Sequence, residues 1–254
     1  MTKIIAVTNQ KGGVGKTTTS VNVAYYLAKS GKKTLLIDFD PQGNATSGLG
    51  IDKSNLSRTM TEVITGQATL QSAIIQTEYK NLALAPSTPH LANTEVELAQ
   101  AEGRFIRLRR AINNLQGYYD YIIIDSPPSL SLLTVNGLIA ANYILLPVQA
   151  EFYALEGLGQ LLETMKLIRK GLNPQLDLLG VLPTMMDSRT TLSTQVHDEI
   201  KKHFPDRVFQ TAIPRNIRLA EAPSHGLPVG AYDRFSKGAR AYKALTKEIL
   251  GRIG

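Results

Sequence analysis

Apolar residues along this 254-residue chain fall into short continuous runs separated by polar, glycine-containing or proline-containing stretches. In the runs Ile4–Thr8 and Tyr121–Asp125, successive residues are apolar rather than every second one. Continuous Ile, Leu and Val are typical of strands buried on both faces, as in a mostly parallel sheet. We predict strands at Ile4–Thr8, Thr34–Asp38, Leu82–Ala85, Tyr121–Asp125, Tyr143–Val148, Leu176–Leu182 and Val208–Ile213.

Between these runs, apolar residues recur at helical spacing. The predicted helices are Thr17–Lys29, Arg104–Leu115, Leu130–Ala141, Leu155–Lys170, Leu192–His203 and Gly238–Leu250. Residues Leu49–Gln100 read as short helices around one strand. Alternation of strands and helices predicts a doubly wound, three-layer α/β fold with a mostly parallel central sheet. Because no linker rich in Pro, Gly and Ser divides the chain, we expect a single domain over residues 1–254.

A glycine-rich loop joins the first predicted strand to the first predicted helix. It reads Lys11-Gly12-Gly13-Val14-Gly15-Lys16-Thr17 and continues through Thr18 into the helix. Strand, glycine-rich loop, Lys-Thr and helix are the context of a phosphate-binding loop, in which backbone N–H groups turn inward around an anion. The positive end of the helix dipole adds to the attraction. Lys16 would reach the β- and γ-phosphates of a nucleotide, and the Thr17 hydroxyl would hold Mg²⁺.

The loop departs from the common pattern, because Gln10 replaces the first glycine and Lys11 adds a second lysine. One lysine is enough to cradle the phosphates of its own subunit. Lys11 is therefore either a solvated loop charge or a residue that enters the site of a partner subunit, as an arginine finger does.

Three carboxylates follow predicted strands. Asp38 and Asp40 end the second strand, and Asp125 ends the strand before Ser126-Pro127-Pro128 in the Walker B pattern. Ligands of a doubly wound sheet bind at the carboxyl ends of its strands, so these side chains are expected near the phosphate loop. They are candidates for holding Mg²⁺ and for positioning an attacking water. The alternative for Asp40-Pro41 is a simple turn.

Residues Ala212–Pro223 follow the last predicted strand and would lie over the base of a nucleotide. Pro214 would pack on the face of the base, and Asn216 would read its edge. The alternative is that Asn216 merely caps the start of a helix.

The composition of the chain excludes several kinds of chemical site and suggests a class of partner. The chain contains no Cys, which excludes disulfides, thiolate catalysis and Cys-ligated zinc or iron–sulfur clusters within it. Net charge is +7, and the segment from Arg189 onward holds twelve Lys/Arg against six Asp/Glu. This excess suggests a polyanionic partner, either nucleic acid or an anionic membrane, although a soluble protein can also simply be basic. No signal-peptide pattern or membrane-spanning apolar run is present, so we expect a cytosolic protein.

Four motifs occur together in one order: the loop ending in Lys16-Thr17, Asp38-Phe39-Asp40-Pro41-Gln42, Ile124-Asp125-Ser126-Pro127-Pro128, and Pro214-Arg215-Asn216-Ile217-Arg218-Leu219-Ala220-Glu221-Ala222-Pro223. Together they resemble the ParA/Soj family of chromosome- and plasmid-partition ATPases with a deviant Walker A motif, over nearly the whole chain.

This resemblance implies that ATP and Mg²⁺ drive formation of a homodimer in which Lys11 contacts the nucleotide of the other subunit. The dimer would bind DNA without sequence preference, and so associate with the nucleoid. A ParB-type centromere-binding partner would stimulate hydrolysis. Asp40 matches the residue assigned to water activation, Pro214 and Asn216 match adenine contacts, and Arg189 and Arg218 match DNA contacts.

Two related functions remain open. A MinD-like ATPase binds membranes through a basic amphipathic terminal helix. Tyr242, Leu245 and Ile249 do recur at helical spacing with basic residues between them, but they could equally pack against the sheet. A ParA-like ATPase that positions another cargo would carry the same motifs, because the cargo adaptor is a separate protein.

Overall fold

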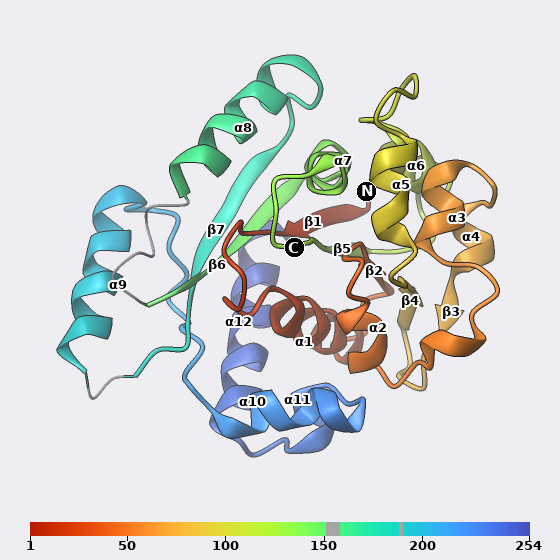
Figure 1. The fold of residues 1–254 in the computed structure, drawn as a ribbon. Helices are drawn as coiled ribbons and strands as arrows, with labels where there is room; N and C mark the ends of the chain where they lie inside the picture. Colours follow the sequence, from red (N-terminus) through yellow and green to blue (C-terminus); the bar gives the residue numbers. More distant parts are fainter. Residues whose placement is uncertain (151–157, 188–189) are drawn as a thin grey trace.

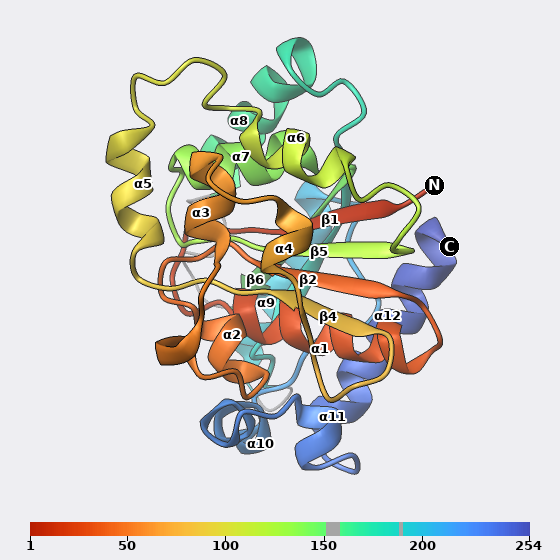
Figure 2. The same cartoon turned by 90° about the vertical axis from the view of Figure 1, so that its right-hand side faces the viewer.

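The computed structural model describes residues 1–150, 158–187 and 190–254. Its centre is a seven-stranded sheet in the order β3-β4-β2-β5-β1-β6-β7, with helices on both faces (Figures 1 and 2). All strand pairs are parallel except β3 with β4. The strands are β1 (Lys3–Val7), β2 (Thr34–Asp38), β3 (Ile75–Gln76), β4 (Leu82–Ala85), β5 (Tyr121–Asp125), β6 (Tyr143–Gln149) and β7 (Asp177–Thr184).

Helices connect most of the strands, and further helices follow β7. The α-helices are α1 (Lys16–Lys29), α2 (Asn44–Gly48), α3 (Met60–Thr65), α4 (Leu70–Ala73), α5 (Leu91–Glu97), α6 (Arg107–Asn113), α7 (Leu132–Ala140), α8 (Leu158–Gly171), α9 (Thr191–His203), α10 (Ile217–Glu221), α11 (Val229–Tyr232) and α12 (Lys237–Ile253). Two 3₁₀ helices, η1 (Lys53–Asn55) and η2 (Ala222–His225), complete the set. The predicted doubly wound α/β fold is confirmed.

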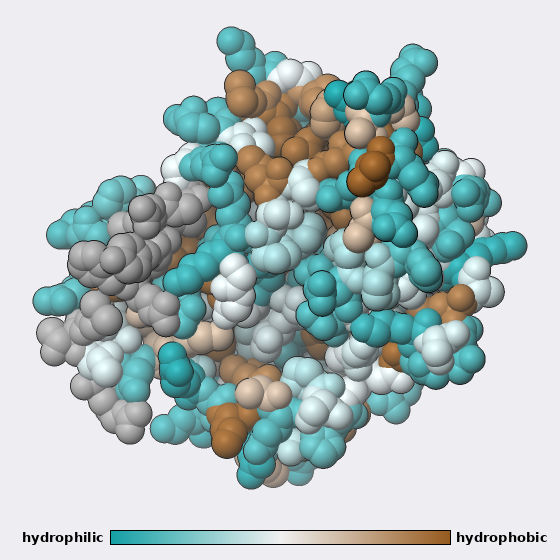
Figure 3. Space-filling model, viewed as in Figure 1, coloured by the Kyte–Doolittle hydropathy of each residue, from teal (hydrophilic) through white to brown (hydrophobic). Residues whose placement is uncertain are grey.

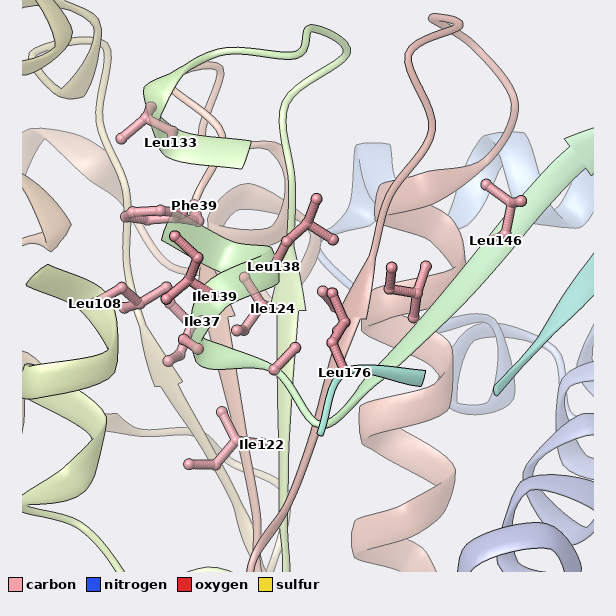
Figure 4. Packing of buried hydrophobic residues seen from close by; sticks show 14 of the residues in the cluster. Ile37, Phe39, Leu108, Ile122, Ile124, Leu133, Leu138, Ile139, Leu146 and Leu176 are labelled. Carbon is pink, nitrogen blue, oxygen red and sulfur yellow. The ribbon is translucent and has the colours of Figure 1, made fainter. Parts of the chain in front are cut away.

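The continuous apolar runs cover both faces of the sheet. In β2, Leu35 and Ile37 belong to one buried cluster and Leu36 to the other. The first cluster packs against helices that include α6 and α7, and Figure 4 shows part of it around Ile37 and Ile124. The second packs against α1 and α12. Because successive side chains of a strand point to opposite faces, only a continuous apolar run can fill both layers.

The predicted strand at Val208–Ile213 is wrong. This segment runs beside β7, but it forms only isolated bridges between Val181 and Val208 and between Met186 and Pro214. The amides of Gln210 and Thr211 donate to the carboxylate of Glu248 rather than to β7. A side chain of α12 thus replaces the ladder partner, and the strand is interrupted.

Other boundaries differ by a few residues. In the stretch Leu49–Gln100, β4 is joined by a two-residue antiparallel partner, β3, which the sequence did not predict. Residues 155–157 of the predicted helix Leu155–Lys170 lie outside the described residues, and α8 is described from Leu158.

The C-terminal helix packs on α1. Ser236 caps its first turn by accepting a hydrogen bond from the backbone N–H of Ala239. Its apolar residues Tyr242, Leu245 and Ile249 are buried in the cluster that contains α1. Within the described ranges, no helix is long and apolar enough to cross a membrane.

Candidate functional site

The glycine-rich loop follows β1 and turns into α1 at Gly15. Gly13 and Gly15 have φ values of 73° and 87°, in the left-handed region that glycine adopts without strain. A Cβ at either position would meet no heavy atom of the described chain within 4 Å. Glycine is therefore required here by backbone conformation, and the space over the loop stays open for a ligand.

Neighbouring strands hold this loop in place. The Asn9 side chain donates to Pro147 O in β6 at 2.7 Å and accepts from the Lys11 backbone N–H at 3.0 Å. The Thr184 hydroxyl at the end of β7 donates to Val14 O at 2.9 Å. The loop is thus fixed from two strands before any ligand binds, which lowers the entropic cost of ordering it.

Lys16 lies in the mouth of the loop and is 7% exposed. Its Nζ donates to Lys11 O at 2.9 Å. Burial lowers the pKa of Lys16, while the charges of Asp125 and Asp40 act in the opposite direction. The two acidic residues therefore lie near the loop, as the sequence predicts, and an anion entering the loop would find the ammonium group already placed.

Asp125 is fully buried at the end of β5 and is held by two hydroxyl groups of α1. Thr17 Oγ1 donates to Asp125 Oδ2, and Ser20 Oγ donates to Asp125 Oδ1, both at 2.8 Å. Because the Thr17 hydroxyl is the donor in its hydrogen bond to the carboxylate, the lone pairs of its oxygen remain available for a cation. Ser20 was missed by the sequence analysis, although it lies one helical turn after Lys16 and so faces the same direction.

Asp38 ends β2 and lies opposite Asp125 in the parallel register. Its Oδ2 accepts from both the backbone N–H and the hydroxyl of Thr46, each at 2.7 Å. Thr46 Oγ1 in turn accepts from the Ser87 backbone N–H at 3.0 Å. Thr46 therefore orients Asp38 from α2, a role that no local sequence signal indicates.

Asp40 is 6% exposed and lies two residues beyond Asp38. Its Oδ1 accepts from the Gln42 backbone N–H at 2.9 Å, and its carbonyl accepts from Gly43 N at 2.9 Å. The Asp-Pro segment is therefore a turn, as the alternative held. The turn nevertheless leaves the carboxylate within electrostatic range of Lys16.

The paired carboxylates carry an electrostatic strain. Burial raises the pKa of Asp38 to about 6, while hydrogen bonds from Thr46 lower it. Burial, followed by repulsion from Asp38, raises the pKa of Asp125 to about 8. A divalent cation would relieve both effects, and the hydroxyl of Thr17 with two carboxylates is an oxygen donor set that suits Mg²⁺.

The described residues do not by themselves form a closed metal cage. Among the described residues, no group of three or more His, Cys, Asp or Glu side chains is placed to hold a metal ion. Mg²⁺ commonly keeps water ligands and takes others from substrate phosphates. The residues present therefore fit a magnesium ion that is completed by a phosphate ligand.

Replacing Asp125 with asparagine is expected to stabilise the ligand-free protein at alkaline pH. In the unfolded chain Asp125 ionises near pH 4, whereas in the folded protein it keeps its proton to about pH 8. The wild type therefore loses stability as pH rises between these values, and the variant does not. The free energy of unfolding of the variant should therefore exceed that of wild type by an amount that grows steadily as pH rises from about 4 to about 8.

Urea denaturation in EDTA across this pH range measures the difference. Asp52→Asn is the control, because hydrogen bonds from Ser54 lower the pKa of Asp52 and reverse the sign of its effect. A stability difference between Asp125→Asn and wild type that does not vary with pH would contradict the proposed strain.

A mainly apolar cavity of about 330 Å³ opens beside Gly15 and Thr18. Pro214 and Asn216 line it, as the sequence analysis predicts for a base pocket. Asn216 is the N-cap residue of α10, but its side chain makes no capping bond. Its Oδ1 is buried, and no hydrogen-bond partner for it exists among the described residues. The capping alternative is therefore wrong, and an acceptor remains for a ligand that donates a hydrogen bond.

Arg218, one of the two arginines predicted to contact DNA, is not among the residues that form this site. Arg218 Nη1 donates to Glu221 Oε2 at 2.7 Å, and Arg218 Nε lies 3.5 Å from Asp233 Oδ2. A phosphate would have to compete with these carboxylates for the guanidinium group. Arg189 lies outside the described residues.

Comparison with known proteins identifies the architecture. A family model described as an AAA domain matches residues 2–178. The chain is 53% identical over 249 residues to sporulation initiation inhibitor protein Soj of Bacillus subtilis, covering 98% of each chain. It is 49% identical over 250 residues to chromosome partitioning protein ParA of Myxococcus xanthus, covering 98% of this chain and 88% of that protein.

A solved structure shares the fold. It is cobyrinic acid a,c-diamide synthase from Mycobacterium smegmatis with bound ATP analog and magnesium, with a TM-score of 0.89 and 39% identity. The match covers 98% of this chain and 94% of that one. On its match to Soj and ParA over nearly its full length, the chain belongs to the ParA/Soj family of chromosome-partitioning ATPases.

Proposed function

We propose that the chain is an ATPase in which residues 1–254 form a single domain that binds ATP with Mg²⁺ and hydrolyses it to ADP and phosphate. The observation that carries this proposal is the joint placement of the loop and the carboxylates. Thr17 and Ser20, in the first turns of α1, hold both oxygens of Asp125 at 2.8 Å. This placement supports a metal–phosphate site at the carboxyl ends of β1, β2 and β5.

Each side chain then has a defined role. The backbone amides from Lys11 to Thr18 would surround the phosphates, with Gly12 and Val14 contributing main-chain groups, and Lys16 would neutralise phosphate charge. Thr17, Asp38 and Asp125 would hold the cation directly or through water. Mg²⁺, when bound, would offset the negative charge of the β- and γ-phosphates.

The remaining pocket would hold adenine. Pro214 would pack on the base, and the unpartnered Asn216 Oδ1 would accept a hydrogen bond from its exocyclic amine. Because a guanine presents a carbonyl oxygen where adenine presents this amine, the acceptor favours ATP over GTP.

We further propose that ATP drives homodimerisation, with Lys11 completing the site of the partner subunit. The dimer would bind DNA non-specifically on the nucleoid, and a ParB-type partner would stimulate hydrolysis during chromosome or plasmid segregation. Basic side chains exposed on α12, including Lys237, Arg240, Lys243 and Lys247, support an electrostatic DNA surface in addition to Arg189 and Arg218.

A membrane role like that of MinD is less well supported. Such a role would need the apolar side of the terminal helix to be available for lipid. In α12 the residues Tyr242, Leu245 and Ile249 are each at most 1% exposed. They pack against α1 and the sheet, which argues against a lipid-binding face on this helix. A ParA-like ATPase that positions another cargo would share every feature of this site.

DNA binding is expected to require ATP and to weaken steeply with salt. If six or more phosphates are contacted, affinity should fall by roughly three orders of magnitude between about 50 and 200 mM salt. Fluorescence anisotropy with two unrelated duplexes, each with ATP, ADP or no nucleotide, measures this. Equal affinity with and without ATP, or insensitivity to salt, would overturn the proposed DNA switch. Sedimentation with anionic vesicles but no DNA binding would favour the membrane function instead.

A further inference from the structure

A large aromatic side chain is exposed at the start of the C-terminal helix. Phe235, in the turn between α11 and α12, is 72% exposed. Ile217, the first residue of α10, is 68% exposed. Folded chains usually bury side chains of this size, and an exposed apolar group that polar residues surround is a candidate for contact with a partner. Neither side chain lines the base cavity.

The exposed ring is held by a fixed turn. The carboxylate of Asp233 accepts from the backbone N–H of Phe235 at 3.1 Å, and the Asp233 carbonyl accepts from the Ser236 backbone N–H at 3.2 Å. Ser236 then caps α12. An apolar residue just before the cap often packs on another in the first turns of the helix, but the residue in that second position here is Arg240. Helix capping therefore does not account for Phe235.

The same aspartate joins this turn to α10. Its other carboxylate oxygen lies 3.5 Å from Arg218 Nε. Gly238, in the first turn of α12, packs directly against Leu219, since a Cβ at Gly238 would lie 2.6 Å from Leu219 Cγ. The segment that carries Ile217 and Arg218 therefore lies beside the turn that carries Phe235, and the two exposed apolar side chains belong to adjacent segments of one surface.

Positive charge surrounds these segments. The guanidinium carbon of Arg234 lies 4.6 Å from the centre of the Phe235 ring. Exposed basic residues continue along α12 at positions 237, 240, 243 and 247. Spacings of three and four residues place them on one side of the helix, in a row about 15 Å long. Of the nearby acidic residues, Glu221 and Asp233 are paired with Arg218. The exposed ring therefore precedes a linear basic surface.

We propose that Phe235 is an apolar DNA contact, with its ring packing against the sugars and base edges of a groove while the neighbouring lysines and arginines bind phosphates. The inference rests on the proposed DNA-binding function. An extended row of charge matches the regular phosphates of a duplex, and an apolar side chain packed into the groove adds affinity without releasing counterions. A lipid surface would instead need a continuous apolar helix face, and the apolar face of α12 is buried.

The test separates apolar from electrostatic binding through the salt dependence. Fluorescence anisotropy with a labelled duplex and Mg²⁺–ATP, between about 50 and 200 mM salt, compares wild type with Phe235→Ala, Phe235→Trp and Lys243→Ala. Phe235→Ala should weaken binding about tenfold at every salt concentration and leave the salt slope unchanged, because no phosphate contact is lost. Phe235→Trp keeps a flat ring and should bind as wild type. Lys243→Ala should reduce the salt slope by about one.

Tyr118→Ala is the matched control, because Tyr118 is an exposed aromatic residue in the turn before β5. It should bind DNA as wild type. Unchanged DNA affinity in Phe235→Ala, or a changed salt slope, would overturn the proposal. Loss of the ATP-dependent dimer in Phe235→Ala, measured by light scattering, would assign the ring to the subunit interface and overturn it.

A membrane role for the ring is tested in parallel with vesicles of phosphatidylglycerol and phosphatidylcholine. If Phe235→Ala lost vesicle binding but kept its DNA affinity, the ring would belong to a lipid contact and the proposal would be wrong. Wild-type protein that binds Mg²⁺–ATP but no DNA would refute the proposed DNA-binding function itself, a result distinct from failure of the Phe235 contact alone.

Discussion

Lys11→Ala is expected to bind ATP almost as well as wild type but to remain monomeric and to lose hydrolysis. Lys16 already lies inside the loop of its own subunit, with its Nζ on Lys11 O. Truncating the Lys11 side chain leaves this backbone acceptor and the Asn9 contact in place. If Lys11 acts on the partner's nucleotide as an arginine finger does, its loss should lower turnover by about a thousandfold or more.

Nucleotide titration, light scattering with ATP and a phosphate-release assay separate these effects. Lys80→Ala, which removes an exposed lysine in the turn before β4, is the control and should behave as wild type. An Lys11→Ala variant that still dimerises with ATP would contradict the role in trans. A variant that no longer binds ATP would place Lys11 in the phosphate site of its own subunit.

Asp40→Ala is expected to yield a long-lived ATP-bound dimer that stays on DNA. Asp40 is nearly buried beside the loop, and its loss should leave Asp38 and Asp125 able to hold the cation. A carboxylate that positions or deprotonates the attacking water contributes roughly a hundredfold to ten-thousandfold to the rate. Turnover should fall by that factor while ATP affinity is retained.

Asp40→Asn refines this test. Its amide oxygen can still accept the hydrogen bond from the Gln42 N–H, so the turn is preserved while the charge is lost. Similar losses of turnover in both variants would assign the effect to the carboxylate rather than to the turn. Glu97→Ala removes an exposed carboxylate on α5 and should have no effect. Undiminished turnover in Asp40→Asn would remove Asp40 from the chemistry.

The sequence predicts the parts of the structure that arise from local chemistry. Continuous Ile and Leu runs predict the buried parallel strands, because both faces of such strands need apolar side chains. The glycines at positions 13 and 15 predict a tight phosphate-binding loop. In the structure both have positive φ values, which glycine adopts without strain. The placement of Asp38 opposite Asp125 follows from parallel register once the strands are known.

Other features depend on contacts between distant segments. The carboxylate of Glu248, on α12, accepts hydrogen bonds from the backbone N–H groups of residues 210 and 211. The apolar run Val208–Ile213 therefore does not form a complete strand. Thr46 orients Asp38 only because α2 folds back over the end of β2. The Tyr242 hydroxyl lies within hydrogen-bond distance of Thr19 only because α12 packs along α1. No local sequence pattern predicts these contacts between distant segments.

The polarity and the charge pairing of the surface around the site also could not be predicted from the sequence. Figure 3 shows that the face of Figure 1 is largely hydrophilic around the loop, with apolar side chains gathered near α7 and α8. Charge counts predict a basic C-terminal segment but not that Arg218 is engaged by Glu221 and Asp233. Pairing of charges depends on tertiary placement, so single arginines chosen from sequence are weaker candidates than the exposed basic residues of α12.

The most direct test of the account is the mass of the protein in solution with and without nucleotide. Multi-angle light scattering should give the chain mass of 27.7 kDa without nucleotide or with ADP. With Mg²⁺–ATP, the Asp40→Ala variant should elute at twice that mass, and Lys11→Ala should stay at the chain mass. A mass that is the same with ATP, with ADP and without nucleotide would contradict the ATP-driven dimer on which the account rests.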